Sequence, residues 1–232
     1  MLEKIEMVRV FGSMSRGDND SDSDLDIIVV CQNSINEDNR LELKQHLEAI
    51  FSHEISCSWY SSQKLDQYFN DGHLFAWHLF LQSKQISRLP DNYQKIFQQP
   101  AEYKLYKEDI SSLIKIMNSI IKSIKFSHSS IVYEAGLLYV CCRNIAMAAS
   151  LLLSDTLQFG RYSPFELNNS KVTFPIGKEN YKVLINSRIA SMRGIAPPNL
   201  VKDEVFQVAN SLIRWAKEIL SELKKQCYDK PT

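Results

Sequence analysis

The most informative stretch of this 232-residue chain reads Phe11-Gly12-Ser13-Met14-Ser15-Arg16-Gly17 and then, after a polar segment, Ser23-Asp24-Leu25-Asp26-Ile27-Ile28. The apolar run Val8–Phe11 is typical of a short strand, which Gly12-Ser13 ends abruptly. The β-branched run Leu25–Val30 is typical of a buried central strand. The stretch therefore predicts two strands joined by a glycine-serine turn and a polar loop.

Two carboxylates stand at the beginning of the second predicted strand. Asp24 and Asp26 are separated by one residue, so the alternation of side chains along a strand places them on the same face. Two anions held so close repel each other unless a cation lies between them. Oxygen ligands from two or three carboxylates, completed by substrate phosphates, are typical of magnesium. We therefore expect Asp24 and Asp26 to bind metal.

The turn before these acids has the residue types of a phosphate-binding site. Gly12 allows the backbone to approach a ligand closely, and the amides around Ser13 can open onto a helix N-terminus, where anions bind well. The Ser13 hydroxyl and the Arg16 guanidinium add hydrogen-bond donors for phosphate. Each feature is weak alone, and only their order indicates a function.

That order resembles the signature of the DNA polymerase β-like nucleotidyltransferases: an apolar residue, Gly, Gly or Ser, a spacer of this length, then acid-hydrophobic-acid before an apolar strand. Arg16-Gly17 matches the fuller form of the signature. The resemblance covers about the first 60 residues and implies that Asp24 and Asp26 hold two magnesium ions. It also implies that Gly12 and Ser13 cradle the β- and γ-phosphates of a nucleoside triphosphate, ATP being the expected donor.

The family usually has a third carboxylate on a later strand, and Glu54 is the candidate here. Residues 54–60 alternate, with Ile55, Cys57 and Trp59 on one face and Glu54 on the other, polar face. Glu54 would contact a metal ion or accept the proton of the acceptor hydroxyl. Many relatives have Asp at this place, and an exposed Glu at the end of a strand is the alternative interpretation.

The remaining pattern predicts an α+β protein in two domains. Residues 1–90 are expected to form a nucleotidyltransferase domain with a small mixed β-sheet, including a helix capped by Asn36 with Leu41, Leu43, Leu47 and Ile50 on its apolar side. A polar connector between Pro90 and Pro100 precedes an all-α helical bundle, residues 101–232. Its helices are expected at 109–126, 131–153 and 178–192, with a long helix last.

The second domain resembles, more vaguely, the helical part of small antibiotic-type nucleotidyltransferases, in which the acceptor binds beside the catalytic sheet. Arg143 lies on the central apolar helix and needs a partner, which is either an acid such as Glu134 or the nucleotide. Glu134, Asp155 and Glu166 are the acids expected to attract a cationic acceptor.

Composition narrows the class of protein further. Lys plus Arg and Asp plus Glu both number 27, so the net charge is zero, and we expect no binding of long nucleic acid. The N-terminus lacks the pattern of a signal peptide, and no apolar run approaches the length of a membrane span. The five cysteines suit buried thiols in a reducing cytoplasm better than disulfides or a zinc site.

The leading hypothesis is thus a magnesium-dependent enzyme that transfers AMP from ATP to a hydroxyl of a small molecule of aminoglycoside type. One alternative is adenylylation of a protein hydroxyl, as in antitoxins of the minimal nucleotidyltransferase type. The other is a nucleotide-binding regulatory protein that has lost catalysis. The oligomeric state is left open.

Overall fold

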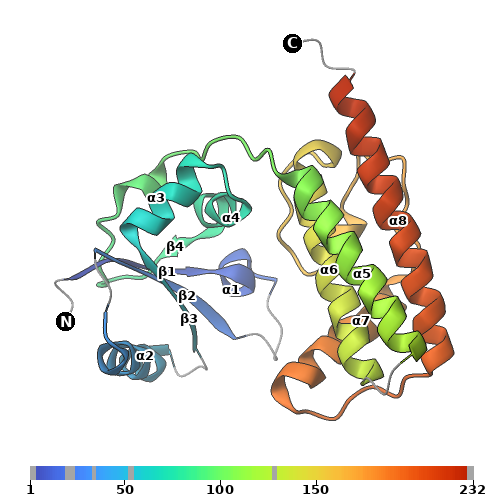
Figure 1. Ribbon diagram of the computed structural model, residues 1–232. Coiled ribbons are helices and arrows are strands. Elements are labelled where there is room, and N and C mark those ends of the chain that lie inside the picture. The colour runs from blue at the N-terminus through green and yellow to red at the C-terminus, as the bar shows by residue number, and fades with distance from the viewer. Residues whose placement is uncertain (1–3, 19–23, 33–34, 52–54, 127–129, 229–232) are drawn as a thin grey trace. The chain divides into compact units, whose positions relative to one another are not determined.

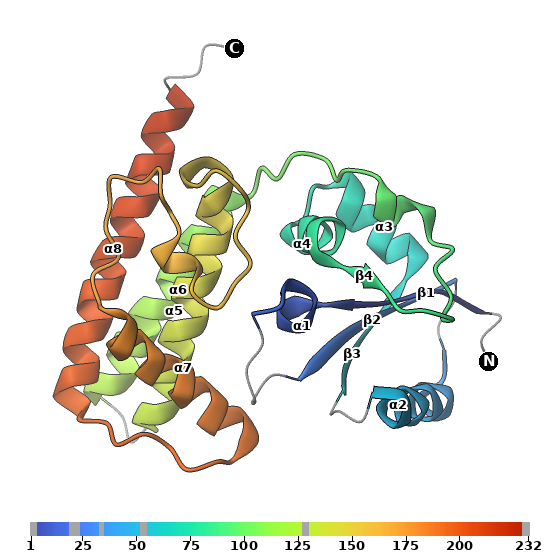
Figure 2. The ribbon, with the colours of Figure 1, turned by 180° about the vertical axis from the view of Figure 1, so that it is seen from behind.

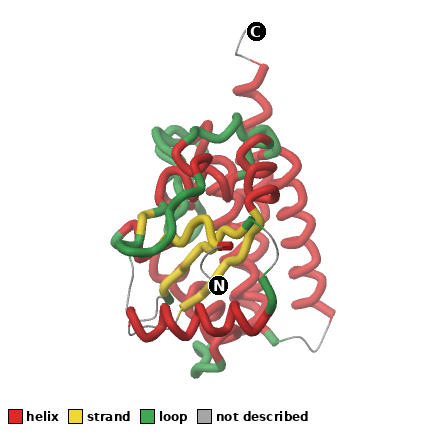
Figure 3. Tube along the Cα trace, turned by 90° about the vertical axis from the view of Figure 1, so that its left-hand side faces the viewer, coloured by secondary structure: helices red, strands yellow, loops and turns green. Residues whose placement is uncertain are grey.

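The computed structural model describes residues 4–18, 24–32, 35–51, 55–126 and 130–228. The chain divides into two compact units, Met1–Lys104 and Leu105–Thr232. The strands all belong to the first unit, as the yellow segments of Figure 3 show. Helices make up the second unit, so the fold is α+β, as the sequence pattern predicts.

The first unit is built on a four-stranded mixed sheet with the order β3-β2-β1-β4. Its strands are β1 (Ile5–Phe11), β2 (Leu25–Cys31), β3 (Ile55–Ser61) and β4 (Lys84–Gln85). Strand β1 pairs antiparallel with β2 and with β4, whereas β3 runs parallel to β2 (Figure 1). The sheet centre is the pair β1 and β2, the two strands that flank the Gly-Ser turn.

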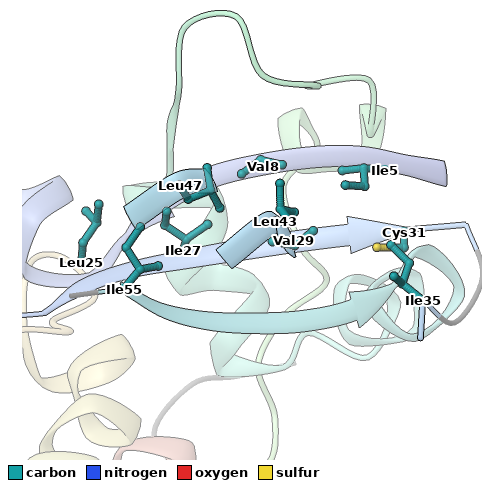
Figure 4. Packing of buried hydrophobic residues seen from close by; sticks show 10 residues of the cluster. All are labelled: Ile5, Val8, Leu25, Ile27, Val29, Cys31, Ile35, Leu43, Leu47 and Ile55. Carbon is teal, nitrogen blue, oxygen red and sulfur yellow. The ribbon is translucent and has the colours of Figure 1, made fainter. Parts of the chain in front are cut away.

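Helices cover both faces of this sheet. The helix α2 (Glu37–Phe51) lies on one face, and α3 (Ser62–Asn70) and α4 (Leu74–Gln82) lie on the other (Figure 1). The side chains of β2 alternate between them: Ile27 and Val29 pack with α2, as Figure 4 shows, whereas Ile28 packs with α3 and α4. Being buried on both faces explains the continuous apolar run of β2.

Helix α2 begins as expected but buries less than expected. The Asn36 side chain accepts a hydrogen bond from the backbone N–H of Asn39 at 3.0 Å and so caps the helix. Leu43 and Leu47 are buried, but Leu41 is 57% exposed and Ile50 is 52% exposed. The predicted four-residue apolar side is wrong for these two positions, because only one narrow stripe of the helix faces the sheet.

The segment between Pro90 and Pro100 packs on the sheet. Asp91 forms a bidentate ion pair with Arg9 of β1, at 2.7 and 2.8 Å, and both side chains are buried. Tyr93 donates a hydrogen bond to Asp66 of α3 at 2.7 Å, and the short helix η2 (Gln94–Phe97) follows. These contacts join the expected connector to the first unit.

In the residues that the structure describes, the second unit has four long helices and a short one. They are α5 (Tyr106–Phe126), α6 (Ile131–Leu153), α7 (Lys178–Arg193), α8 (Lys202–Tyr228) and η3 (Ser163–Phe165). Helix α6 contacts all the others, and Figure 2 shows α7 lying along it. Within the part of the chain that the structure describes, α6 alone is long and apolar enough to cross a membrane, but 61% of its apolar window is buried, as in the core helix of a bundle.

A glycine sets how closely α6 and α7 approach. A Cβ atom added to Gly136 would lie 2.8 Å from the Cα of Arg188 and 3.0 Å from its backbone nitrogen. No side chain larger than hydrogen therefore fits between the two backbones at this crossing. The close approach fixes α7 against the central helix.

Candidate functional site

The Gly-Ser turn forms the end of β1 and the beginning of a short helix. Gly12 has φ 73°, a left-handed conformation that glycine adopts at little cost, and α1 (Gly12–Arg16) starts there. The helix closes with hydrogen bonds from the amides of Gly17 and Asp18 to the Ser13 carbonyl, at 2.9 and 3.2 Å. The turn thus reverses the chain tightly at the edge where β2 begins.

The carboxylate of Asp26 lies directly against this turn. Asp26 is opposite Phe11 in the pairing of β2 with β1, so it is the neighbour of Gly12 across the ladder. A Cβ atom added to Gly12 would lie 2.3 Å from Oδ2 of Asp26, well inside contact distance. Gly12 is therefore required both by its own backbone conformation and by the position of the Asp26 carboxylate.

Asp24 immediately precedes β2 and, like Asp26, is partly exposed. Asp26 has the parity of Ile28 and Val30, whose side chains face α3 and α4. Strand alternation therefore fixes the face of Asp26, whereas Asp24 stands one residue before the strand begins.

Arg16 is held by neighbours within the unit. Its Nε lies 3.1 Å from both carboxylate oxygens of Asp18, and one terminal nitrogen donates to the side-chain oxygen of Gln82 at 3.1 Å. The buried Ser15 hydroxyl donates to the backbone carbonyl of Gln82 as well. The end of α4 thus fixes α1, a role of Gln82 that no short motif in the sequence indicates.

Glu54, the expected third carboxylate, lies outside the described residues. The nearest described pairs, Leu25 with Ile55 and Asp26 with Ser56, put the beginning of β3 beside the beginning of β2. Among the described residues, no group of three or more His, Cys, Asp or Glu side chains is arranged to hold a metal ion. The exposed Ser56, opposite Asp26, is a neighbour of the site that sequence analysis did not identify.

Apolar and aromatic side chains bound this face of the sheet. Tyr60 of β3 packs on Phe75 and Tyr68, with ring centroids 5.3 and 5.8 Å apart. Burial raises the pKa of the Tyr60 hydroxyl, so the phenol stays neutral at physiological pH.

Arg143, the candidate on the central helix α6, has backbone partners in the second unit. Its guanidinium donates to the carbonyls of Phe159 and Gly160, at 2.8 and 3.4 Å. The acid suggested as its partner, Glu134, is buried and accepts a hydrogen bond from Ser123 instead. Arg143 therefore holds the loop that follows α6.

The similarity of this chain to a known protein family lies within the first unit. Residues 1–75 match the family described as Polymerase beta, Nucleotidyltransferase. No curated protein sequence matches the chain.

Two solved structures match the chain at low sequence identity. One is a spectinomycin adenyltransferase, AAD(9), from Enterococcus faecialis with ATP and spectinomycin, with 11% identity, a TM-score of 0.45 and coverage of 93% of this chain and 92% of that chain. The other is a toxin-antitoxin with AMP-PNP, with 18% identity, a TM-score of 0.31 and coverage of 50% of this chain and 86% of that one. The match to the family spans β1, the Gly-Ser turn, both aspartates and β3. The similarity of this chain to the polymerase β nucleotidyltransferase family thus covers its first 75 residues, which contain the candidate site.

Proposed function

We propose that this protein transfers a nucleoside monophosphate, AMP from ATP, to a hydroxyl of a small acceptor and releases pyrophosphate. The observation that carries the proposal is the position of the Asp26 carboxylate against the Gly12 turn at the start of α1. A metal-binding carboxylate beside a turn with open backbone amides suits a substrate that brings phosphates and a divalent cation together.

The residues at the turn fit magnesium. Asp24 and Asp26 would hold it, with Glu54 as the third carboxylate, because β3 begins beside β2. Magnesium, when bound, neutralises triphosphate charge and stabilises the attacking and leaving oxygens. A side chain at position 12 would displace the Asp26 carboxylate, so the glycine keeps this ligand in place.

Other residues of the turn would position the triphosphate. The amides of Gly12 and Ser13 and the Ser13 hydroxyl would donate to its β- and γ-phosphates. The Arg16 guanidinium, restrained by Asp18 and Gln82, would add positive charge beside them. Gln82 would act indirectly, by holding Arg16 and Ser15 in place.

In the transfer itself, the acceptor oxygen bonds to the α-phosphorus while the bond from that phosphorus to the oxygen bridging the α- and β-phosphates breaks. Glu54 would take the proton of the acceptor hydroxyl, and pyrophosphate leaves with the electron pair of the broken bond. Every atom is then accounted for by ATP, the acceptor and one general base.

An acceptor of aminoglycoside type is the first to test. Of the three acids expected to attract a cationic molecule, Asp155 and Glu166 are exposed, whereas Glu134 is buried and accepts a hydrogen bond from Ser123. Asp155 and Glu166 would therefore contribute most of that attraction in the second unit.

Thermal shift with ATP tests the nucleotide site. ATP with magnesium should stabilise the protein, and Asp26→Asn should abolish the magnesium-dependent part of the shift. Asp71→Asn, which removes an exposed carboxylate after α3, is the matched control and should leave it unchanged.

Pyrophosphate release with a panel of aminoglycosides, neutral polyols and candidate partner proteins then identifies the acceptor. A nucleotide-binding regulator would behave differently. ATP would stabilise it equally with and without magnesium, and no acceptor would lead to release of pyrophosphate. Full transfer rates in both Asp24→Asn and Asp26→Asn would disprove the site.

A further inference from the structure

The zero net charge of the chain hides two oppositely charged units. Met1–Lys104 contains 10 Lys and Arg against 16 Asp and Glu, whereas Leu105–Thr232 contains 17 against 11. The helical unit therefore has a formal charge of +6 and the sheet unit one of −6. The zero net charge of the whole chain therefore does not exclude nucleic acid as a ligand of the helical unit.

Part of this positive charge gathers on the solvent face of α7. At 100° per residue, Lys178, Lys182 and Arg193 fall within about 60° of one another on the helix, and all three are exposed. Tyr181 lies about 60° from Lys178 on the side away from Lys182, Leu184 lies about 120° away, and both are buried. The three cations form a row along one face of the helix.

The loop before α7 adds aromatic rings and a further cation. Tyr162, which is 36% exposed, lies 5.9 Å from the ring of Tyr181, and the Tyr181 hydroxyl donates to the backbone carbonyl of Arg161 at 3.2 Å. The ring of Phe165 lies 5.8 Å from Nζ of Lys178. We call the set Arg161, Tyr162, Phe165, Lys178, Lys182 and Arg193 the basic aromatic surface.

Helix α6 holds both parts of the basic aromatic surface in place. Arg143 of α6 donates to the carbonyls of Phe159 and Gly160, and Ser163 donates to the Arg143 carbonyl at 3.3 Å. Gly136 brings α7 close to α6. Both parts of the surface, the loop and α7, are thus fixed to the same central helix. Two exposed acids, Glu166 and Glu179, lie in the same two segments.

The length of the row indicates the kind of ligand. Lys178 and Arg193 are fifteen residues apart, which corresponds to about 22 Å along a helix at 1.5 Å per residue. One triphosphate is too short to contact both ends, whereas a strand with a phosphate at every nucleotide can. Rings beside cations are the combination on which bases of single-stranded nucleic acid stack while lysines and arginines pair with its phosphates.

We propose that the helical unit binds single-stranded nucleic acid on the basic aromatic surface. Fluorescence anisotropy of the full chain with a labelled RNA oligonucleotide, and with DNA of the same sequence, tests this and shows which of the two is preferred. Affinity should fall steeply with salt, with a slope near −0.7 in log-log form for each phosphate contacted.

Charge reversal locates the surface. Lys178→Glu with Lys182→Glu should weaken binding at least about tenfold and reduce the salt slope by about 1.4. The matched control is Lys115→Glu with Lys122→Glu, an equal change of charge at exposed positions on α5, on which α7 does not pack. Equal losses in the two double variants would overturn the proposal, because they would show diffuse attraction to the whole unit.

A third variant separates nucleic acid from other polyanions. Tyr162→Ala should weaken oligonucleotide binding about fivefold through lost stacking and leave heparin binding unchanged. Two results together would contradict the assignment of nucleic acid as the ligand. They are oligonucleotide binding that Tyr162→Ala leaves unchanged, and heparin binding as tight as oligonucleotide binding. Asp24→Asn and Asp26→Asn should not affect oligonucleotide affinity, so this inference and the proposed transfer activity succeed or fail separately.

Discussion

At the scale of single residues, Gly12 and Asp26 define the candidate site together. The glycine has a left-handed backbone, and the space where its side chain would be is taken by the Asp26 carboxylate. The chain has a second left-handed glycine in the same segment, Gly17, with φ 79° and no atom within 4 Å of an added Cβ. The two glycines thus differ in their surroundings and share their backbone conformation.

Gly12→Ala should lower the rate of the proposed transfer about 100-fold, because a methyl group there displaces the carboxylate that we propose as a metal ligand by an ångström or more. Gly17→Ala should cost a similar backbone penalty of about 1–2 kcal/mol and leave the rate nearly unchanged. Steady-state kinetics and urea unfolding of both variants check this. Similar rates in the two variants would mean that the position of Asp26 does not matter for activity.

At the scale of elements, two ion pairs hold the sheet unit in different ways. Arg9 and Asp91 join β1 to the segment after α4, with side chains only 9% and 7% exposed. Arg16 and Asp18 lie at the end of α1, and Asp18 is 45% exposed. Solvent screens the second pair much more than the first.

Asp91→Asn should therefore destabilise the protein by about 3–5 kcal/mol, because it leaves the buried Arg9 guanidinium without its counter-charge. Asp18→Asn should cost at most about 1 kcal/mol. Urea unfolding monitored by circular dichroism measures both. A small effect of Asp91→Asn would show that water or another group compensates Arg9.

Where α6 and α7 cross, replacing glycine by alanine should change stability in the direction opposite to that expected from helix propensity. In an exposed helix, Gly→Ala stabilises by about 1 kcal/mol. Gly136→Ala should instead destabilise by about 1–3 kcal/mol, since the new methyl group meets the backbone of Arg188. Thermal unfolding decides the sign, and stabilisation would mean that the two helices separate at no cost.

At the scale of the whole molecule, buried thiols link stability to alkaline pH. Burial raises the pKa of Cys141 from 9.0 to about 12 and that of Cys57 to about 11. Between pH 9 and these values the folded chain keeps its thiols protonated while the unfolded chain loses the protons. The unfolded state then binds fewer protons, so the free energy of unfolding falls as pH rises.

For Cys141 this fall should be about 1.4 kcal/mol per pH unit above pH 9. Urea unfolding between pH 7 and pH 10.5 measures it. Cys141→Ala removes the titrating group, so its stability should decline less steeply over the same range. Identical slopes in the variant and the parent chain would show that Cys141 ionises while the protein is folded.

The sequence predicted the elements with strong local signals. The apolar alternation of β3, the cap at Asn36 and the 3–4 spacing along α5 each act between residues close in the chain. These elements were therefore predicted at nearly their observed bounds. The burial of α2 was predicted less well, because which side of a helix meets the sheet depends on packing and not on the helix alone.

By itself, the sequence determined the α+β class, the glycine-serine turn and the acid pair, because strand alternation and glycine's backbone freedom are properties of short segments. The tertiary structure alone decided that Asp26 lies against Gly12, that Gln82 holds Arg16, and that Arg143 holds the loop after α6. These facts join residues that are distant in the chain, and only the pairing of strands and the packing of helices bring such residues together.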